Sequence, residues 1–276
     1  MGGADLSVWL EGWDCGAAPG RIVEGLTGLG LEDVERAGDR WAQIDCPPRL
    51  VRHTQAVLGF ARQAVSRTRD GRVAIGLPCS PRGLAGAEEL LWRGISVGVG
   101  PVSTTATWRA VAQRFTRALE RRRAVGLPVD GVACVAWVPV GLIDDHSDPF
   151  LARSSSLRGA AGIATAQLLY LLAFQTLAGQ RWADLRAEGA QPPRLGWNRL
   201  TAERRASYIS RLTLPGSVIA LPHRWATEIE REALDVAEAD ETEADWTSRE
   251  LVASGVPLQQ VLVQVEAGAP VPKNAG

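Results

Sequence analysis

The sequence contains almost no lysine. Of the 30 basic side chains in its 276 residues, only Lys273 is a lysine, and the other 29 are arginines. Lys273 lies near the C-terminal end of the chain. A mechanism that needs a side-chain amine inside the fold is therefore excluded.

Cysteine and histidine are also scarce, with four and three residues. Cys15, Cys46, Cys79 and Cys134 are far apart and form no Cys-x-x-Cys pair, so the sequence is neither a zinc finger nor a disulfide scaffold. Cys15, Cys46 and Cys79 each follow a predicted strand. They are either soft-metal ligands that converge at a rim or small buried residues. We expect reduced thiols, no metal and no cofactor.

Neither sign of charge is in excess, because 31 acidic residues offset the basic ones to a net charge of −1. This balance argues against a nucleic acid or a membrane surface as partner. The first ten residues lack the basic and long apolar regions of a signal peptide. The apolar stretch Gly162–Gly179 carries Thr and Gln residues typical of a buried helix. We expect a cytoplasmic protein with a small-molecule partner. The sequence does not decide whether the chain forms a homo-oligomer.

Short apolar runs bounded by Gly, Pro or Asp alternate with helical patterns along the chain. Such alternation predicts a parallel α/β sheet, either doubly wound or closed as a (β/α)8 TIM barrel. We favour the barrel, because no glycine-rich dinucleotide fingerprint follows the first strand. The predicted strands are Leu6–Leu10, Ile22–Leu26, Ala42–Cys46, Val73–Leu77, Ile95–Val99, Val132–Val138, Leu195–Trp197 and Val218–Leu221.

Helical periodicity is clearest in five segments, and Ser80 and Ser103 are typical N-cap residues for two of them. The acidic stretch Glu232–Asp245 predicts a solvated helix and loop. We expect one domain over residues 1–268 and a disordered tail over residues 269–276. The five helical segments are Pro48–Ser66, Ser80–Trp92, Ser103–Val125, Leu157–Leu177 and Ala206–Leu212.

Several motifs occur in the order found in the transaldolases, and from Leu6 to about Gly268 the chain resembles that family. The resemblance implies a (β/α)8 barrel. The chain is shorter than the family pattern between its second and third strands, where it has only Gly30–Arg40. The motifs that carry the resemblance are Ser7-Val-Trp-Leu-Glu11, Ala42-Gln-Ile-Asp-Cys-Pro-Pro-Arg-Leu50, Ile75-Gly-Leu-Pro-Cys-Ser-Pro-Arg-Gly-Leu84, Arg158-Gly-Ala-Ala-Gly-Ile-Ala-Thr-Ala166 and Gly179-Gln-Arg-Trp182.

The chain departs from this family in its chemistry. Transaldolases use a fourth-strand lysine to form a Schiff base with a keto-sugar phosphate, and that lysine matches Gly76. The two proton-handling acids are retained as Glu11 and Asp45, with their side-chain lengths exchanged. The arginines that hold the phosphate match Leu142 and Leu200. Since a class I aldolase needs an amine nucleophile, we expect no transaldolase activity.

Inward-pointing residues of the barrel strands define a candidate site at the carboxyl ends of the strands. Glu11 and Asp45 are the candidate acid and base, with burial and repulsion raising one pKa. The alternative is that both are remnants, bonded to backbone amides or paired with arginines such as Arg49 and Arg82. The other candidate residues are substrate-binding: Trp137, Trp13, Gly76, Gly98, Gly100, Asn198 and His223.

The glycines and Trp137 predict a pocket that is roomy on one side and aromatic on the other. A ring-containing, mostly apolar ligand would stack on Trp137, whereas a sugar phosphate would lack its arginines. Alternatively, Trp137 fills the space left by the glycines and plugs the barrel. His223 is either a proton shuttle or a surface histidine. Trp197 is a further tryptophan that could touch a ligand, and His146 is expected in a loop.

Two functions remain open. One is a repurposed, lysine-independent enzyme of specialised metabolism that uses Glu11 and Asp45 for cyclisation, rearrangement or condensation. The other is a non-catalytic descendant that binds a metabolite or a protein partner. The arrangement of the two acids distinguishes these functions: an enzyme would hold both acids in an open pocket, whereas a scaffold has no reason to do so.

Incubation with a keto-sugar phosphate followed by borohydride should leave the mass of the chain unchanged, because no internal amine can form an imine. Intact-protein mass spectrometry measures this directly. A stoichiometric adduct on any residue other than Lys273 or the amino terminus contradicts the prediction.

Overall fold

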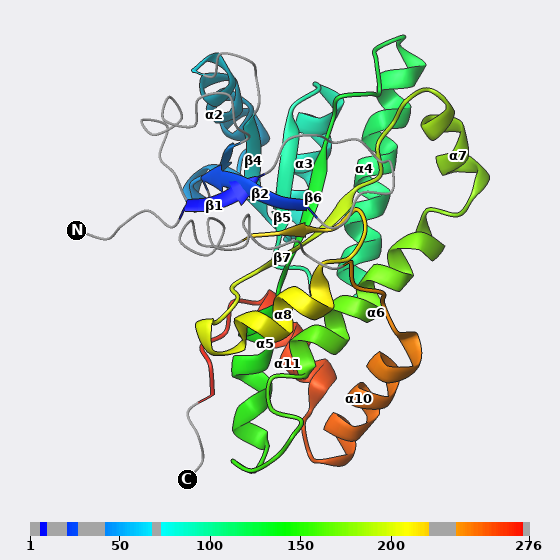
Figure 1. Ribbon diagram of the computed structural model, residues 1–276. Helices are drawn as coiled ribbons and strands as arrows, with labels where there is room; N and C mark the ends of the chain where they lie inside the picture. The colour runs from blue at the N-terminus through cyan, green and yellow to red at the C-terminus, as the bar shows by residue number, and fades with distance from the viewer. Residues whose placement is uncertain (1–5, 10–20, 27–41, 68–72, 221–235, 273–276) are drawn as a thin grey trace.

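The computed structural model describes residues 6–9, 21–26, 42–67, 73–220 and 236–272 (Figure 1). Strands alternate with helices over most of this chain, as the sequence predicts for an α/β fold. Each predicted strand is present, with bounds within a few residues of those expected. The strands are β1 Leu6–Trp9, β2 Arg21–Leu26, β3 Ala42–Asp45, β4 Val73–Pro78, β5 Ser96–Gly100, β6 Cys134–Pro139, β7 Arg194–Asn198 and β8 Val218–Ile219.

The strands form one sheet in the order β1-β2-β8-β7-β6-β5-β4-β3. From β3 through β8 to β2 every ladder is parallel. The register brings inward positions of successive strands side by side, with Asp45 opposite Gly76 and Gly76 opposite Gly98. Residues far apart in sequence therefore meet on one face of the sheet.

The sheet departs from the predicted closed barrel in two respects. Within the described residues no ladder joins β3 to β2, and β1 runs antiparallel to β2, with Leu6 opposite Leu26. A parallel connection between neighbouring strands needs a crossover of a dozen or more residues, usually including a helix. Only residues 10–20 separate β1 from β2. An antiparallel pair is the arrangement that so short a connection favours.

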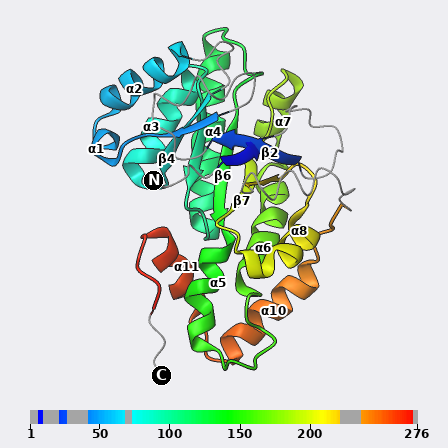
Figure 2. The same ribbon diagram turned by 60° about the vertical axis from the view of Figure 1, so that its left-hand side comes forward.

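The helices fall into two groups (Figures 1 and 2). Helices α2, α3 and α4 lie along the strands, whereas α5, α8, α10 and α11 gather at one end of the molecule. This is the carboxyl end of the sheet, because β6 ends at Pro139 and α5 begins at Val140. The helical segments are α1 Pro48–Val51, α2 Thr54–Ser66, α3 Pro81–Trp92, α4 Thr105–Ala124, α5 Val140–Ser147, η2 Asp148–Phe150, α6 Ala161–Thr176, α7 Gln180–Ala187, η3 Ala202–Arg204, α8 Arg205–Leu212, α10 Glu241–Ala253 and α11 Leu258–Glu266.

The predicted N-cap is correct for α3 and wrong for α4. Ser80 accepts a hydrogen bond from the Gly83 amide at 3.1 Å. In α4 the cap is Thr104, whose hydroxyl accepts from the Thr107 amide at 3.2 Å, while the Ser103 hydroxyl donates to the Leu262 carbonyl. Ser103 is thus used to hold α11 rather than to begin α4.

Glu266, at the end of α11, also binds the first turn of α4. Its Oε1 accepts from the amides of Ser103 and Thr104, both at 2.8 Å, and its Oε2 accepts from the Thr107 hydroxyl at 2.8 Å. A carboxylate at this position satisfies unpaired amides and complements the positive end of the helix dipole. The C-terminal helix is thereby fixed to the barrel helices.

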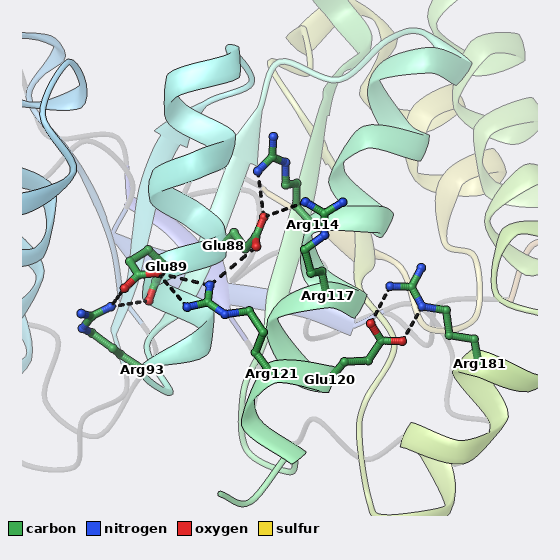
Figure 3. A network of polar contacts seen from close by, with 8 residues as sticks. All are labelled: Glu88, Glu89, Arg93, Arg114, Arg117, Glu120, Arg121 and Arg181. Carbon is green, nitrogen blue, oxygen red and sulfur yellow. Dashed lines mark hydrogen bonds and ion pairs between the residues drawn. The ribbon is translucent and has the colours of Figure 1, made fainter. Parts of the chain in front are cut away.

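One face of α4 is apolar, and its residues Trp108, Val111, Phe115, Ala118 and Leu119 are all buried. Its opposite face carries arginines that pair with glutamates of α3, and Glu120, which pairs with Arg181 of α7 (Figure 3). Arg114 and Arg121 bind Glu88 and Glu89 of α3 at 2.8 and 3.2 Å. The polar face of α4 is therefore a layer of ion pairs that holds neighbouring helices.

One bent pair of helices, α6 with α7, has the combined length and apolar composition of a membrane span, with an 81° bend between them. Within the described residues no single helix meets that test.

The described chain continues past the predicted domain end at residue 268. The Ala269 amide donates to the Gln264 carbonyl, and the Ala269 carbonyl lies 3.2 Å from His146 Nε2.

Replacing Glu266 with alanine should lower the free energy of unfolding by about 2 kcal/mol, because buried amides at the start of α4 lose a charged acceptor. Urea unfolding followed by circular dichroism measures the change. Glu188→Ala, which removes a half-exposed acid with a single 3.7 Å ion pair, is the control and should change stability by less than about 0.5 kcal/mol. Equal effects in the two variants would show that Glu266 does not hold α11 in place.

Candidate functional site

A cavity of about 670 Å³ lies at the carboxyl ends of strands β3 to β7. Because these ends meet at one edge of the sheet, each strand contributes residues to its wall. Six of the candidate residues from the sequence line it: Asp45, Gly76, Gly98, Gly100, Trp137 and Asn198. Glu11, Trp13 and His223 lie outside the described residues.

Three side chains form a hydrogen-bonded row across the floor of this cavity, which we call the floor row. The Trp137 indole Nε1 donates to Gln43 Oε1 at 2.7 Å, and Gln43 Nε2 donates to Asp45 Oδ1 at 3.0 Å. Gln43 and Trp137 are buried, whereas Asp45 is exposed. The floor row therefore holds one carboxylate at the cavity and fixes its orientation from below.

The glycines of β4 and β5 make room for the floor row. A Cβ atom on Gly76 would lie 1.8 Å from Asp45 Oδ1, and one on Gly98 would lie 1.9 Å from Gln43 Oε1. The volume that these glycines release is filled by Gln43, Asp45 and Trp137. The cavity is lined by these side chains and also by Gly76, Gly98 and Gly100.

The Trp137 ring is packed more closely than the sequence suggests. A Cβ atom on Gly196 of β7 would lie 2.5 Å from Trp137 Cε3, and one on Gly100 would lie 2.9 Å from Trp137 Cβ. The ring is 4% exposed. The indole thus combines the two alternatives from the sequence: it fills the space beside the glycines and also borders the cavity.

Trp197, which the sequence offers as a further ligand contact, has a structural role. It is fully buried, and its Nε1 donates to the Leu212 carbonyl at 2.9 Å and to Ser217 Oγ at 3.1 Å. Strand residues alternate between the two faces of the sheet. Gly196 faces Trp137, so Trp197 points outward against α8.

The end of β7 carries an unpaired acceptor and an unusual backbone. Asn198 Oδ1 is buried at the cavity and has no hydrogen-bond partner among the described residues. Arg199 follows with a φ of 58°, a left-handed conformation that is uncommon for residues other than glycine. The carbonyl oxygen of Arg199 lies 2.0 Å from the position that a Cβ atom on Gly141 would occupy. Strained backbone of this kind is frequent at binding sites.

The charged residues of the wall are Asp45, Arg52, Arg82 and Arg199. Among the described residues no ion pair joins Asp45 to Arg49 or Arg82. The pairing of Asp45 with either of these arginines, which the sequence left open, is therefore not observed. Leu142, which matches a phosphate-binding arginine of the transaldolases, lines the cavity. The arginines present come from other positions, of which sequence reasoning named Arg82 and missed Arg52 and Arg199.

The described cysteines are unsuited to nucleophilic chemistry at neutral pH. Burial, with a contribution from the nearby Asp45, raises the pKa of Cys46 to about 11. Burial raises the pKa of Cys79 to about 12. The described residues contain no group of three or more His, Cys, Asp or Glu that could hold a metal ion. Cys15 lies outside them.

Sequence reasoning also missed α5, and with it the environment of His146 and Asp144. His146 is not in a loop: it is fully buried on α5, with Nδ1 2.9 Å from the Leu142 carbonyl and Nε2 3.2 Å from the Ala269 carbonyl. Asp144 binds the Gly162 amide and the Tyr208 hydroxyl, both at 2.7 Å, and burial raises its pKa to about 6. The apolar spacing of Val140 and Ile143 was the available signal for this helix.

The sequence matches transaldolases of several bacteria. It is 30% identical to transaldolase 1 of Streptomyces avermitilis over 199 residues, which are 69% of this chain and 53% of that protein. It is 27% identical to the transaldolase of Mycolicibacterium paratuberculosis over 242 residues, 83% of this chain and 65% of that protein. The chain is a distant homologue of the transaldolases. No family model matches it.

The chain spans about half the length of the Streptomyces relatives that it matches. Transaldolase homology implies a TIM barrel, and the parallel order of β3 to β8 agrees with it, although the ladders of the described residues do not close the barrel. The homology thus explains the fold and the location of the cavity.

Gly98→Ala should destabilise the protein by about 1–3 kcal/mol, because the new methyl group would collide with Gln43 and with Trp137 Nε1 and break the floor row. Gly59→Ala is the matched control. Gly59 lies in the exposed part of α2 with nothing within 4 Å of its Cβ position, so alanine should stabilise by about 0.5–1 kcal/mol. Thermal unfolding measures both variants, and a neutral Gly98→Ala would mean that Gln43 is free to move.

Proposed function

We propose that the cavity is the active site of a transaldolase-like enzyme that works without a Schiff base, with Asp45 as a general acid or base. The observation that carries this proposal is the relation between Asp45 and Gly76. A side chain at position 76 would begin 1.8 Å from Asp45 Oδ1. Resemblance to the transaldolases matches Gly76 with their lysine, so here a carboxylate oxygen lies where that lysine side chain would begin.

The setting of Asp45 supports a role in proton transfer. Gln43 donates to Oδ1, which leaves Oδ2 for a substrate, and Gln43 is itself held by the Trp137 indole. A reacting group fixed in this way loses little entropy on binding a substrate. Glu11 is proposed as its partner acid, on the strength of the sequence alone.

The wall supports a mostly apolar substrate with a few polar groups. Its apolar part consists of residues from the ends of strands and from helices α1, α5 and α11, and its buried polar part includes Asn198 Oδ1, which needs a donor. A substrate hydroxyl or amine would supply that donor. The exposed arginines of the wall, Arg52, Arg82 and Arg199, would accept an anionic substituent at the rim. The apolar lining residues are Val51, Leu77, Pro78, Pro101, Pro139, Leu142 and Val265.

Cyclisation, rearrangement and condensation are the reactions that one or two carboxylates can promote without a cofactor. We place the protein in specialised metabolism as part of the same proposal. The experiment is a thermal-shift screen of ring-containing metabolites that carry at least one hydroxyl, followed by mass spectrometry of each binder for conversion.

Asp45→Asn should lower turnover of a converted binder by roughly 10²-fold while the variant still binds it, because a general acid or base is lost and the shape is kept. Glu11→Gln should have a comparable effect. Asp184→Asn, which changes an exposed acid of α7, is the control and should keep full turnover. Unchanged turnover in both Asp45→Asn and Glu11→Gln contradicts the proposal.

The second candidate is a non-catalytic protein that binds a metabolite in the same cavity. The burial of Trp137 favours it, because part of the barrel interior is packed like a core. This alternative predicts binders that are never converted, and an affinity for them that depends on Asn198 rather than on Asp45.

A further inference from the structure

A second cavity, of about 190 Å³, lies on the outer side of the barrel, where the first turns of α6 face α8 and α10. These three helices are neighbours in both views of the fold (Figures 1 and 2). We call it the α6 cavity. It shares no lining residue with the cavity that contains Asp45.

The wall of the α6 cavity is mostly polar and supplies many hydrogen-bond donors. Arg158 comes from the loop before α6 and Arg211 from α8, and the hydroxyls of Ser207 and Thr247 lie beside them. The N-terminal end of α6, a helix of 16 residues, contributes the positive end of its dipole. The local potential of this wall favours an anion.

Both guanidinium groups are partly engaged but keep donors for a ligand. Arg211 Nη2 lies 2.7 Å from Glu243 Oε2. Arg158 Nη1 donates to the carbonyls of Asp148 and Leu151 at 2.6 and 3.2 Å, and its Nη2 lies 3.7 Å from Asp148 Oδ2, which leaves Nε without a partner among the described residues. A guanidinium has five N–H donors in a planar fork. The acidic partners therefore orient the arginines without using all of their donors.

Gln167 supplies the second, independent observation. It is 2% exposed and lines the α6 cavity, and its Oε1 has no hydrogen-bond partner among the described residues. Its Nε2 donates to the Arg211 carbonyl at 3.3 Å, which fixes the orientation of the amide. A buried acceptor without a donor is unfavourable. The wall therefore requires a ligand that accepts from the arginines and also donates one hydrogen bond.

We propose that the α6 cavity binds a small oxyanion that carries a hydroxyl hydrogen, such as hydrogen phosphate or a 2-hydroxycarboxylate. Its oxygens bind Arg158 and Arg211, and its hydroxyl donates to Gln167 Oε1. Sulfate and acetate have the charge but lack the donor, so each leaves Gln167 unpaired. This site is separate from the proposed active site and does not depend on it.

Isothermal titration of the full chain at pH 7 with phosphate, lactate, sulfate and acetate tests the ligand chemistry. We expect phosphate to bind at least about 10-fold more tightly than sulfate, or lactate to bind at least about 10-fold more tightly than acetate. The reason is that a site built around a ligand hydroxyl discriminates against analogues that lack it. The preferred pair distinguishes an inorganic from an organic ligand. Equal affinities within both pairs, or no binding at all, overturn the proposal.

Substitutions then locate the bound anion. Arg211→Met should weaken binding by about 10-fold or more, because a charged donor is lost. Arg181→Met is the matched control, since Arg181 is also an exposed arginine paired with a glutamate, Glu120. It should leave binding unchanged. Binding that is kept in Arg211→Met and lost in Arg199→Met would assign the anion to the other cavity and overturn the proposal.

Gln167→Leu tests the hydroxyl requirement. It should remove the preference for the hydroxyl-bearing anion, so that phosphate and sulfate, or lactate and acetate, bind equally. A preference that survives in a folded Gln167→Leu variant overturns the assigned role of Gln167. If that variant does not fold, the Arg211→Met result still decides the location of the site, because Arg211 lies on the exposed side of α8.

Discussion

The hydrogen-bonded row from Trp137 through Gln43 to Asp45 is the interaction on which the interior of the sheet depends. It joins β6 to β3 across β4 and β5. That path is open only because both intervening strands have glycine at the inward positions, where any Cβ atom would strike a member of the row. The glycines, the indole and the amide are therefore one structural unit.

This unit explains how the interior of the sheet is filled. Close packing does not tolerate an empty space over the glycines. In this chain the space is filled by polar side chains that satisfy one another and by an indole ring. The result is a floor row that presents one exposed carboxylate to the cavity, whose wall also holds the buried and unpaired Oδ1 of Asn198. The proposed acid–base chemistry rests on this arrangement.

The carboxyl end of the sheet is covered by segments that other parts of the chain hold in place. Glu266 binds the start of α4, and the buried His146 binds Ala269, so the C-terminal segment forms part of the cavity wall through Val265 and Gly268. Asp144 binds the start of α6. These contacts are made by polar groups from distant positions, which is why the wall includes residues that no single motif contains.

The sequence by itself determined the strand and helix alternation, the absence of an internal amine, and the positions at which Asp45, Gly76, Gly98 and Trp137 meet. Periodicity and strand register follow from local spacing, so these features can be predicted. Only the tertiary structure decided that Gln43 fills the space over the glycines, that Trp197 points outward, that His146 is buried, and that β1 pairs antiparallel with β2. Each of these depends on which distant groups compete for the same volume or hydrogen bond, and local spacing contains no information about that competition.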